Sequence, residues 1–185
     1  LASASGSSGK ILNKVFREAV TTAKLVKSQL SISSFPLSVG YIGIKKLSEA
    51  IGGLTGKRFL VIGTGEMGTL AVKHLQAEHA EAILLCSRSC EKAASEYGDH
   101  VKMIPFSQRY DCIPDVDGIV TATASPHAVF TAEKIPPRIK PLCIIDMAVP
   151  PDVDASVRSL GNIRVIGIDD IHTISAENLA QRQSL

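Results

Sequence analysis

The 185-residue chain is predicted to fold as a doubly wound parallel α/β sheet, flanked by helical segments at both ends. Two observations carry this prediction. Six short segments after residue 57 are almost wholly apolar, which is typical of parallel strands buried on both faces. Helical or turn patterns separate these segments, and such alternation favours a sheet that is covered by helices.

The strands are expected over residues 58–63, 82–87, 101–106, 118–124, 142–148 and 163–169. Apolar residues recur at helical spacing over about residues 67–78, so a helix should join the first two strands. A shorter helix is expected over residues 90–97, because Gly98 is a usual helix terminator.

Two helices are predicted ahead of the sheet and one behind it. Residues 10–30 place their apolar side chains on one face, and Pro36 separates them from a second helix over about residues 37–51. Gly40 and Gly43 would weaken that second helix unless another element packs closely against it. Ser175 is typical of the N-cap of a last helix.

The predicted organisation has linker helices over residues 1–53, a nucleotide-binding domain over residues 54–172 and the start of a C-terminal helix over residues 173–185. The net charge of +2 gives no footprint for broad nucleic-acid binding. No apolar run approaches membrane-spanning length and no secretion signal is visible, so a cytoplasmic protein is expected. The four cysteines lack metal-ligand spacing, which predicts plain thiols and no metal site.

The strongest motif follows the first predicted strand and opens a helix. It consists of Gly63, Thr64, Gly65, Glu66, Met67 and Gly68. In the Rossmann-like G-x-G-x-x-G turn, the first glycine permits the tight turn and the second lets the backbone approach a pyrophosphate. The third lets the helix pack on the sheet. The plainer alternative is an ordinary glycine-rich turn without a ligand.

The second predicted strand ends without the carboxylate that an NAD site normally places there. Ser87, Arg88 and Ser89 stand at this point, and Lys92 follows one turn later. Arg88 can pair with a 2′-phosphate and stack on adenine, while the serines can donate hydrogen bonds. NADP(H) is therefore the predicted cofactor, unless Arg88 is only a solvated loop residue.

Other candidates follow the fourth and fifth strands, at the edge where open sheets of this class bind ligands. Thr123, Ala124 and Ser125 could line the cofactor, and His127 could approach it or be a plain surface residue. Met147, Ala148 and Val149 could pack on the nicotinamide ring. The alternative there is a rigid proline turn with Asp146 as a capping residue.

Taken together, these motifs resemble the NADPH-binding domain of glutamyl-tRNA reductases over most of the chain. The segments that carry the resemblance are "GKRFLVIGTGEMGTLAVKHL", "TATASPHAVF", "IIDMAVPPDVD" and "IDDIHTISAENLAQR". The glycine turn alone is shared with many dehydrogenases, whereas its combination with the later segments is far more specific. Pro151 departs from the arginine that the family often has, and "VKSQLSIS" departs from its Arg-x-Glu-Thr stretch.

The resemblance implies an oxidoreductase of tetrapyrrole (porphyrin, haem) biosynthesis that reduces glutamyl-tRNA to glutamate-1-semialdehyde. A cysteine thiolate attacks the ester, and the thioester takes a hydride from NADPH. The family's nucleophile lies in a Thr-Cys-Asn-Arg motif, which this chain lacks, so no catalytic residue is expected here. The implied partners are glutamyl-tRNA, a second copy of the parent protein and glutamate-1-semialdehyde aminomutase.

Two alternatives stay open. A shikimate-dehydrogenase-like NADP enzyme shares the glycine turn and the arginine after the second strand. It would need a substrate domain with a catalytic lysine and aspartate, for which this sequence shows no place. A non-enzymatic NADP-sensing or assembly module could use the terminal helices as docking arms. A Thr-Cys-Asn-Arg stretch upstream in the parent gene would distinguish these possibilities.

Overall fold

A computed structural model describes residues 9, 11–12, 14–15, 18–19, 22, 35–87 and 97–171. The chain divides into two compact units, Leu1–Pro36 and Leu37–Leu185. The described residues of the first unit between 11 and 22 are helical, in agreement with the predicted helix. The three side chains Ile11, Leu12 and Val15 are exposed. The predicted division at residues 53 and 172 stays a prediction.

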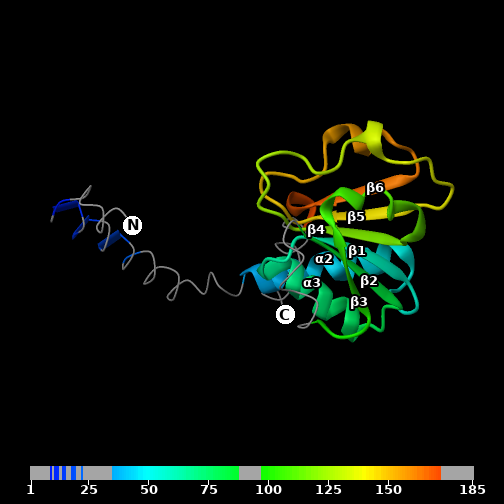
Figure 1. Cartoon of the computed structure of the whole chain (residues 1–185), viewed down its shortest axis with the longest axis horizontal. Helices are drawn as coiled ribbons and strands as arrows, with labels where there is room; N and C mark the ends of the chain where they lie inside the picture. The colour runs from blue at the N-terminus through cyan, green and yellow to red at the C-terminus, as the bar shows by residue number, and fades with distance from the viewer. Residues whose placement is uncertain are drawn as a thin grey trace, which may run out of the picture. The chain divides into compact units, whose positions relative to one another are not determined.

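The second unit contains one six-stranded parallel sheet in the order β3-β2-β1-β4-β5-β6 (Figure 1). The strands are β1 (Arg58–Ile62), β2 (Ala82–Ser87), β3 (Val101–Pro105), β4 (Gly118–Thr121), β5 (Leu142–Asp146) and β6 (Ile163–Gly167). This arrangement confirms the predicted doubly wound fold. The predicted strands 118–124, 142–148 and 163–169 were too long. Buried carboxylates bind the backbone after Thr121 and Asp146 and draw it out of the sheet, and residues 168–169 begin a helix.

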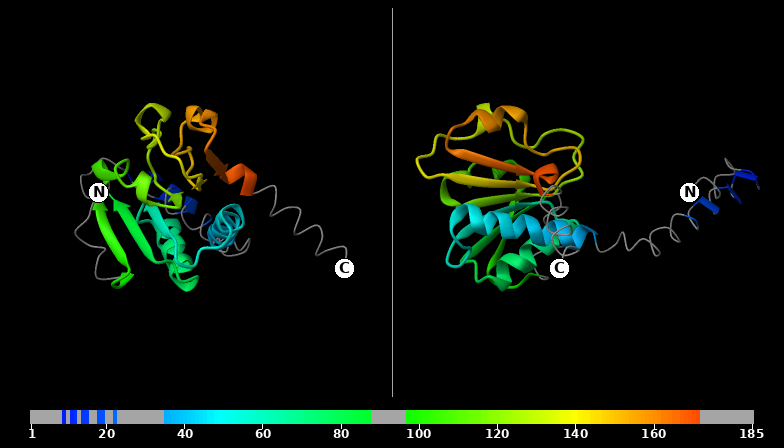
Figure 2. Two further views of the ribbon diagram at one scale, coloured as in Figure 1. Left: turned by 90° about the vertical axis from the view of Figure 1, so that its right-hand side faces the viewer. Right: turned by 180° about the vertical axis from the view of Figure 1, so that it is seen from behind.

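Helices α2 (Phe35–Ile51) and α3 (Glu66–Ala77) cover one face of the sheet (Figure 2). Leu47 of α2 and Leu75 of α3 are fully buried against it with Phe59. The other face is covered, within the described residues, by loops and four short 3-10 helices. These are η3 (Phe106–Gln108), η4 (Ile113–Asp115), η5 (Ala132–Lys134) and η6 (Ala155–Ser159).

The two glycines inside α2 lie where neighbouring elements approach its backbone. A Cβ on Gly40 would come within 2.6 Å of Leu70 Cδ2, and one on Gly43 within 3.1 Å of Ile145 Cγ2 and 3.2 Å of Met147 Sδ. The expectation that close packing compensates for these glycines is confirmed. α2 is therefore part of the core of the second unit, resting on α3 and on the end of β5.

The end of the described chain departs from the prediction in one respect. Residues 168–171 are already helical, ahead of Ser175. Asp170 Oδ2 accepts a hydrogen bond from Gly167 N at 2.8 Å, which stabilises this earlier helix start. Ser175 lies outside the described residues, as do all but Tyr97 of the predicted helix over 90–97.

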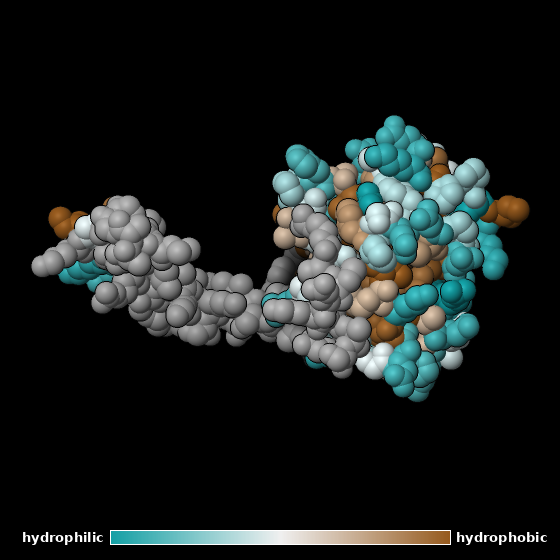
Figure 3. All heavy atoms as spheres, viewed as in Figure 1, coloured by the Kyte–Doolittle hydropathy of each residue, from teal (hydrophilic) through white to brown (hydrophobic). Residues whose placement is uncertain are grey.

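The strand order reverses direction between β1 and β4, which creates a crevice at their carboxyl ends. Ile62 pairs with Thr121 there, so the turn after β1 and the loop after β4 start side by side. Figure 3 shows apolar side chains gathered near the middle of the described domain on this view, with hydrophilic side chains around them. Among the described residues, no helix is long and apolar enough to cross a membrane.

Candidate nucleotide-binding site

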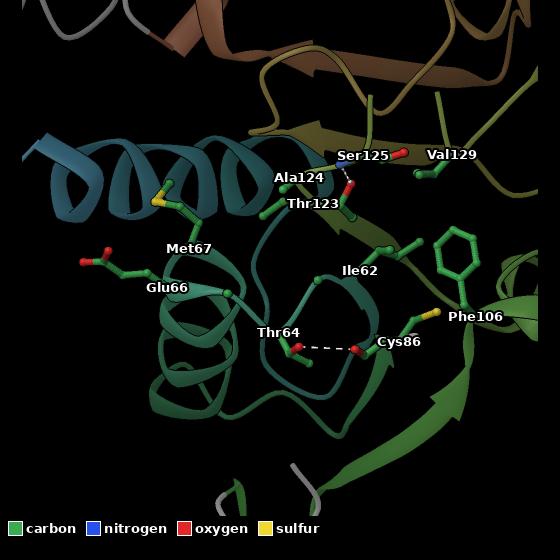
Figure 4. Close-up of a pocket in the computed structure, with 14 residues that line it drawn as sticks. Ile62, Thr64, Glu66, Met67, Cys86, Phe106, Thr123, Ala124, Ser125 and Val129 are labelled. Atoms are coloured by element: carbon green, nitrogen blue, oxygen red, sulfur yellow. Dashed lines mark hydrogen bonds between the residues drawn. The ribbon is translucent and has the colours of Figure 1, made fainter. Parts of the chain in front are cut away.

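A cavity of about 460 Å³ occupies the crevice at the carboxyl ends of β1, β2 and β4 (Figure 4). Its lining residues are Ile62, Gly63, Thr64, Gly65, Glu66, Met67, Cys86, Ser87, Phe106, Ala122, Thr123, Ala124, Ser125 and Val129. Nine of these belong to the predicted cofactor-binding set. The structure therefore brings the glycine turn, the end of the second strand and the loop after the fourth strand around one space.

The glycine turn has the steric properties that a dinucleotide requires. Gly63 has a φ of 109°, and a Cβ there would lie 2.3 Å from the carbonyl oxygen of Ala122. A Cβ on Gly68 would lie only 2.0 Å from the carbonyl oxygen of Gly63, so α3 sits directly on the turn. A Cβ on Gly65, by contrast, would meet nothing within 4 Å. The backbone at Gly65 thus borders open space, as the approach of a pyrophosphate to this turn would require.

The start of α3 offers hydrogen-bond donors to this space. Gly65 is the N-cap residue, and it provides no side chain to bond the first amides of the helix. These amides and the helix dipole favour an anion. Glu66 lies in the first turn but is exposed, and Figure 4 shows its carboxylate directed away from the other labelled cavity residues. Its charge is therefore screened by solvent.

The end of β2 forms a second side of the cavity. Ser87 is 8% exposed, and its hydroxyl lies 3.2 Å from that of Thr64, which joins the two strand ends (Figure 4). Either oxygen can be the donor in this pair. Arg88, Ser89 and Lys92, the other predicted readers of the ribose, lie outside the described residues.

The loop after β4 forms the opposite side, and a buried carboxylate holds it. Asp152 is fully buried, and its Oδ2 accepts a hydrogen bond from Thr123 N at 2.9 Å while its Oδ1 accepts from Thr123 Oγ1 at 2.5 Å. Ser125 N in turn donates to Thr123 Oγ1 at 3.1 Å. Burial raises the pKa of the Asp152 carboxyl, although the hydrogen bonds from Thr123 oppose that shift.

Asp146 holds the loop after β5 in the same way, by accepting hydrogen bonds from its backbone. Its buried carboxylate accepts from Thr121 Oγ1 at 3.0 Å, from Ala148 N at 3.1 Å and from Val153 N at 2.9 Å. It therefore caps that turn, as the alternative interpretation of this residue expected.

The three predicted nicotinamide contacts after β5 do not line the cavity. Met147 is 5% exposed and belongs to the core cluster beneath α2, and Ala148 is 3% exposed. Val149 is 73% exposed. His127 is also exposed, and its backbone, not its ring, bonds to Ser125. A role of these residues toward a cofactor stays a prediction.

Besides Ile62, Cys86 and Ala122, each of which adjoins a predicted residue, sequence reasoning missed three residues of the site. Asp152 holds the loop, while Phe106 and Val129 line the cavity from the loops after β3 and β4. Phe106 could have been found, because it directly follows a strand whose carboxyl end faces the same edge. Asp152 and Val129 carry no local signal, since their roles depend on contacts between loops.

Comparison with protein-family models finds that residues 45–174 match the model for shikimate/quinate 5-dehydrogenase. This span includes the whole sheet and the glycine turn. A domain of this family and fold implies a nicotinamide cofactor.

Individual relatives align over almost the whole chain. The chain is 40% identical over 180 residues to a glutamyl-tRNA reductase of Clostridium novyi, covering 96% of this chain and 44% of that protein. The solved glutamyl-tRNA reductase of Methanopyrus kandleri is 31% identical with a TM-score of 0.71, over 97% of this chain and 47% of that one.

A third comparison concerns the nucleotide-binding domain of the glutamyl-tRNA reductase from Thermoplasma volcanium. It shares the fold, with a TM-score of 0.60 at 21% identity over 80% of this chain and 97% of that one. The resemblance to glutamyl-tRNA reductases is thus confirmed, although the chain spans less than half the length of the full relatives. By the family model that covers most of its length, the chain belongs to the shikimate/quinate 5-dehydrogenase family.

Proposed function

We propose that this chain is the NADPH-binding part of a glutamyl-tRNA reductase, the oxidoreductase that reduces glutamyl-tRNA to glutamate-1-semialdehyde in tetrapyrrole biosynthesis. The observation that carries the proposal is the open space at Gly65 beneath the uncapped start of α3. The relatives of that name, which align over almost the whole chain, supply the choice of enzyme.

In the proposed complex, the amides of Gly65 to Gly68 bind the pyrophosphate, as the position of the cavity supports. Thr64 and Ser87 bond the adenosine ribose with their hydroxyls. Thr123, Ala124 and Ser125 border the other half of the dinucleotide. NADPH, once bound, supplies a hydride. The residues of this chain bind and orient it and exclude water from it, and none of them attacks the substrate.

The preference for NADPH over NADH is proposed to come from Arg88, with help from Ser89 and Lys92. The sequence at the end of β2 has a cation and hydroxyls where an NAD site would have a carboxylate. Ser87 is the last residue of β2, and its hydroxyl is beside the cavity. A 2′-phosphate there would meet donors and no acidic side chain from this strand end.

The rest of the proposed function concerns the parent protein. Glutamyl-tRNA would bind through a catalytic domain that carries the nucleophilic cysteine. A second copy of the parent and a glutamate-1-semialdehyde aminomutase are its proposed partners, and the cytoplasm is its proposed location. Met147, Ala148 and Val149 are proposed to contact the nicotinamide once the other domains are in place.

Calorimetric titration of this chain with both cofactors tests the proposal. Arg88→Ala should weaken NADPH binding by roughly 10- to 100-fold, the value of a lost charge-assisted hydrogen bond. NADH binding should change far less, and Ser87→Asp should disfavour NADPH further. Equal losses for both cofactors would show that Arg88 does not read the phosphate.

A turnover assay tests the missing nucleophile. The chain alone, given NADPH and glutamyl-tRNA, should form no semialdehyde. Semialdehyde formation would make one of its four cysteines the nucleophile. The same preparation given shikimate and NADP should also show no turnover. Activity with shikimate would favour the shikimate-dehydrogenase alternative that the family model raises.

A further inference from the structure

Two apolar side chains from different loops form part of the cavity wall. Phe106 begins η3 directly after β3, and Val129 lies in the loop after β4. Figure 4 shows the Phe106 ring between the Val129 side chain and Cys86 at the end of β2. The end of β2 is the side of the cavity that the proposed function gives to the adenosine half of the dinucleotide. Val129 follows the segment Thr123 to Ser125, which is given to the other half.

Arg109 connects the two loops from behind this wall. Its guanidinium carbon lies 4.1 Å from the centroid of the Phe106 ring. Nη1 donates to the carbonyl oxygen of Phe106 at 2.8 Å, and Nε donates to that of Val129 at 2.9 Å. Arg109 itself is not among the residues that line the cavity in the described part of the chain.

The main chain of Val129 is fully occupied by the protein. Its carbonyl accepts from Arg109 and also from Tyr110 Oη at 3.1 Å. Its amide donates to the carbonyl of Asp152 at 2.6 Å. Val129 can therefore offer the cavity only its apolar side chain, and the wall it forms with Phe106 is suited to a flat, weakly polar group.

A purine base is such a group. Aromatic and aliphatic side chains contact bases through their faces, and ligand cavities are mostly apolar with few polar groups that fix orientation. The ring of Phe106 is held by a cation on one side, which limits its rotation and keeps it available on the cavity side.

We propose that Arg109 is a positioning residue that holds Phe106 and Val129 in place as the apolar contact surface for the adenine base of the bound dinucleotide. The proposal rests on the proposed function, since it requires a dinucleotide in this cavity. Arg109 acts through the two wall residues and does not touch the ligand.

The test compares the two halves of the cofactor on the full 185-residue chain. Arg109→Leu should weaken NADPH and 2′,5′-ADP, which carries only the adenosine half, by about 5- to 20-fold, the range of one or two lost hydrogen bonds. Reduced nicotinamide mononucleotide, which lacks the adenosine half, should bind as it does to the unmodified chain. A general loss of structure would weaken all three ligands alike.

Two further variants keep the result interpretable if Arg109→Leu folds poorly. Arg109→Lys keeps a cation over the ring and one donor, so its affinity for 2′,5′-ADP should lie between those of the leucine variant and the unmodified chain. Tyr110→Phe removes one of the two side-chain donors to the Val129 carbonyl, together with the acceptor of the Thr131 amide. It should produce a smaller loss, again confined to the adenosine-bearing ligands.

Arg138→Leu is the matched control. Arg138 is also half-buried and also donates to main-chain carbonyls, those of Ile113 and Val116, but it lies at the opposite edge of the sheet. It should lower stability without changing any of the three affinities. Unchanged 2′,5′-ADP affinity in the Arg109 variants, or equal losses for both halves, would overturn the inference. Absence of NADPH binding to the unmodified chain would overturn the proposed function instead.

Discussion

The carboxyl and amino ends of the parallel strands differ in the charged side chains that they bury. Among the described residues, the two buried carboxylates, Asp146 and Asp152, lie at the carboxyl ends, where Arg109 also bonds loop carbonyls. At the carboxyl edge, the buried Asp146 and Asp152 accept hydrogen bonds from the backbone amides of the loops after β4 and β5. At the amino edge, Arg138 donates to the carbonyls of Ile113 and Val116 before β4. Lys57 donates there to the carbonyls that end α2, including that of Gly53 at 2.8 Å.

The partners of the two buried carboxylates explain how the carboxyl ends of the strands can still receive a phosphate. Buried backbone groups need partners, and a carboxylate can only accept whereas an ammonium or guanidinium can only donate. The carboxylate oxygens of Asp146 and Asp152 accept hydrogen bonds from loop amides, so these donors within the protein compensate the two carboxylates. The amides of the glycine turn, which no side chain caps, then set the electrostatic character of the cavity.

The largest expected effect comes from breaking the turn itself. Gly68→Ala should lower the free energy of unfolding by about 3 kcal/mol or more, because its Cβ would overlap the carbonyl of Gly63. Gly65→Ala should change stability by no more than about 1 kcal/mol, the cost of a poorer N-cap residue. It should still weaken NADPH at least about tenfold by filling the space for the pyrophosphate. Urea unfolding and calorimetry separate the two quantities, and equal stability of both variants would contradict the steric argument.

A smaller effect should distinguish the two edges. Asp146→Ala leaves two buried amides and one hydroxyl without their acceptor and should cost about 3 kcal/mol of unfolding free energy. Arg138→Ala should cost about 1 kcal/mol, since Arg138 is only half-buried and water can reach the carbonyls it leaves. Chemical denaturation of both variants measures the difference. A larger loss of unfolding free energy in Arg138→Ala would show that the loops at the amino ends of the strands are the more strongly stabilised.

The smallest effects are pH-dependent and should have opposite signs at two neighbouring carboxyls. Burial raises the pKa of Asp152, so folding is disfavoured as pH rises from the ordinary value of 3.8 through the folded pKa. Hydrogen bonds from Ser156 lower the pKa of the exposed Asp154, so its contribution is present above 3.8 and lost as pH falls through the folded pKa.

The corresponding asparagine variants test these signs. Relative to Asp152→Asn, the unmodified chain should lose stability as pH rises across that window. Relative to Asp154→Asn, it should gain stability as pH rises toward 3.8. Unfolding free energies measured between about pH 3 and pH 7 decide the matter. Parallel slopes for the two variants would mean that burial does not govern Asp152.

The sequence predicted the sheet well because each strand is an apolar run, a signal contained within the strand. It overestimated three strands because Ala122, Met147 and Ile168 continue the apolar pattern after the backbone has left the sheet. The glycine turn and Ser87 were also predictable, since their geometry is local. Asp152 was not, because its partner Thr123 is 29 positions away and only the folded chain brings them together.

The close approach at Gly43 also has a consequence for how related sequences can vary. A side chain at position 43 would contact Ile145 of β5, Met147 directly after β5, and Ile171 after β6. These positions share one fixed volume. Among relatives, a residue larger than glycine at position 43 should therefore occur together with a smaller residue at one of the other three positions. The four positions should covary.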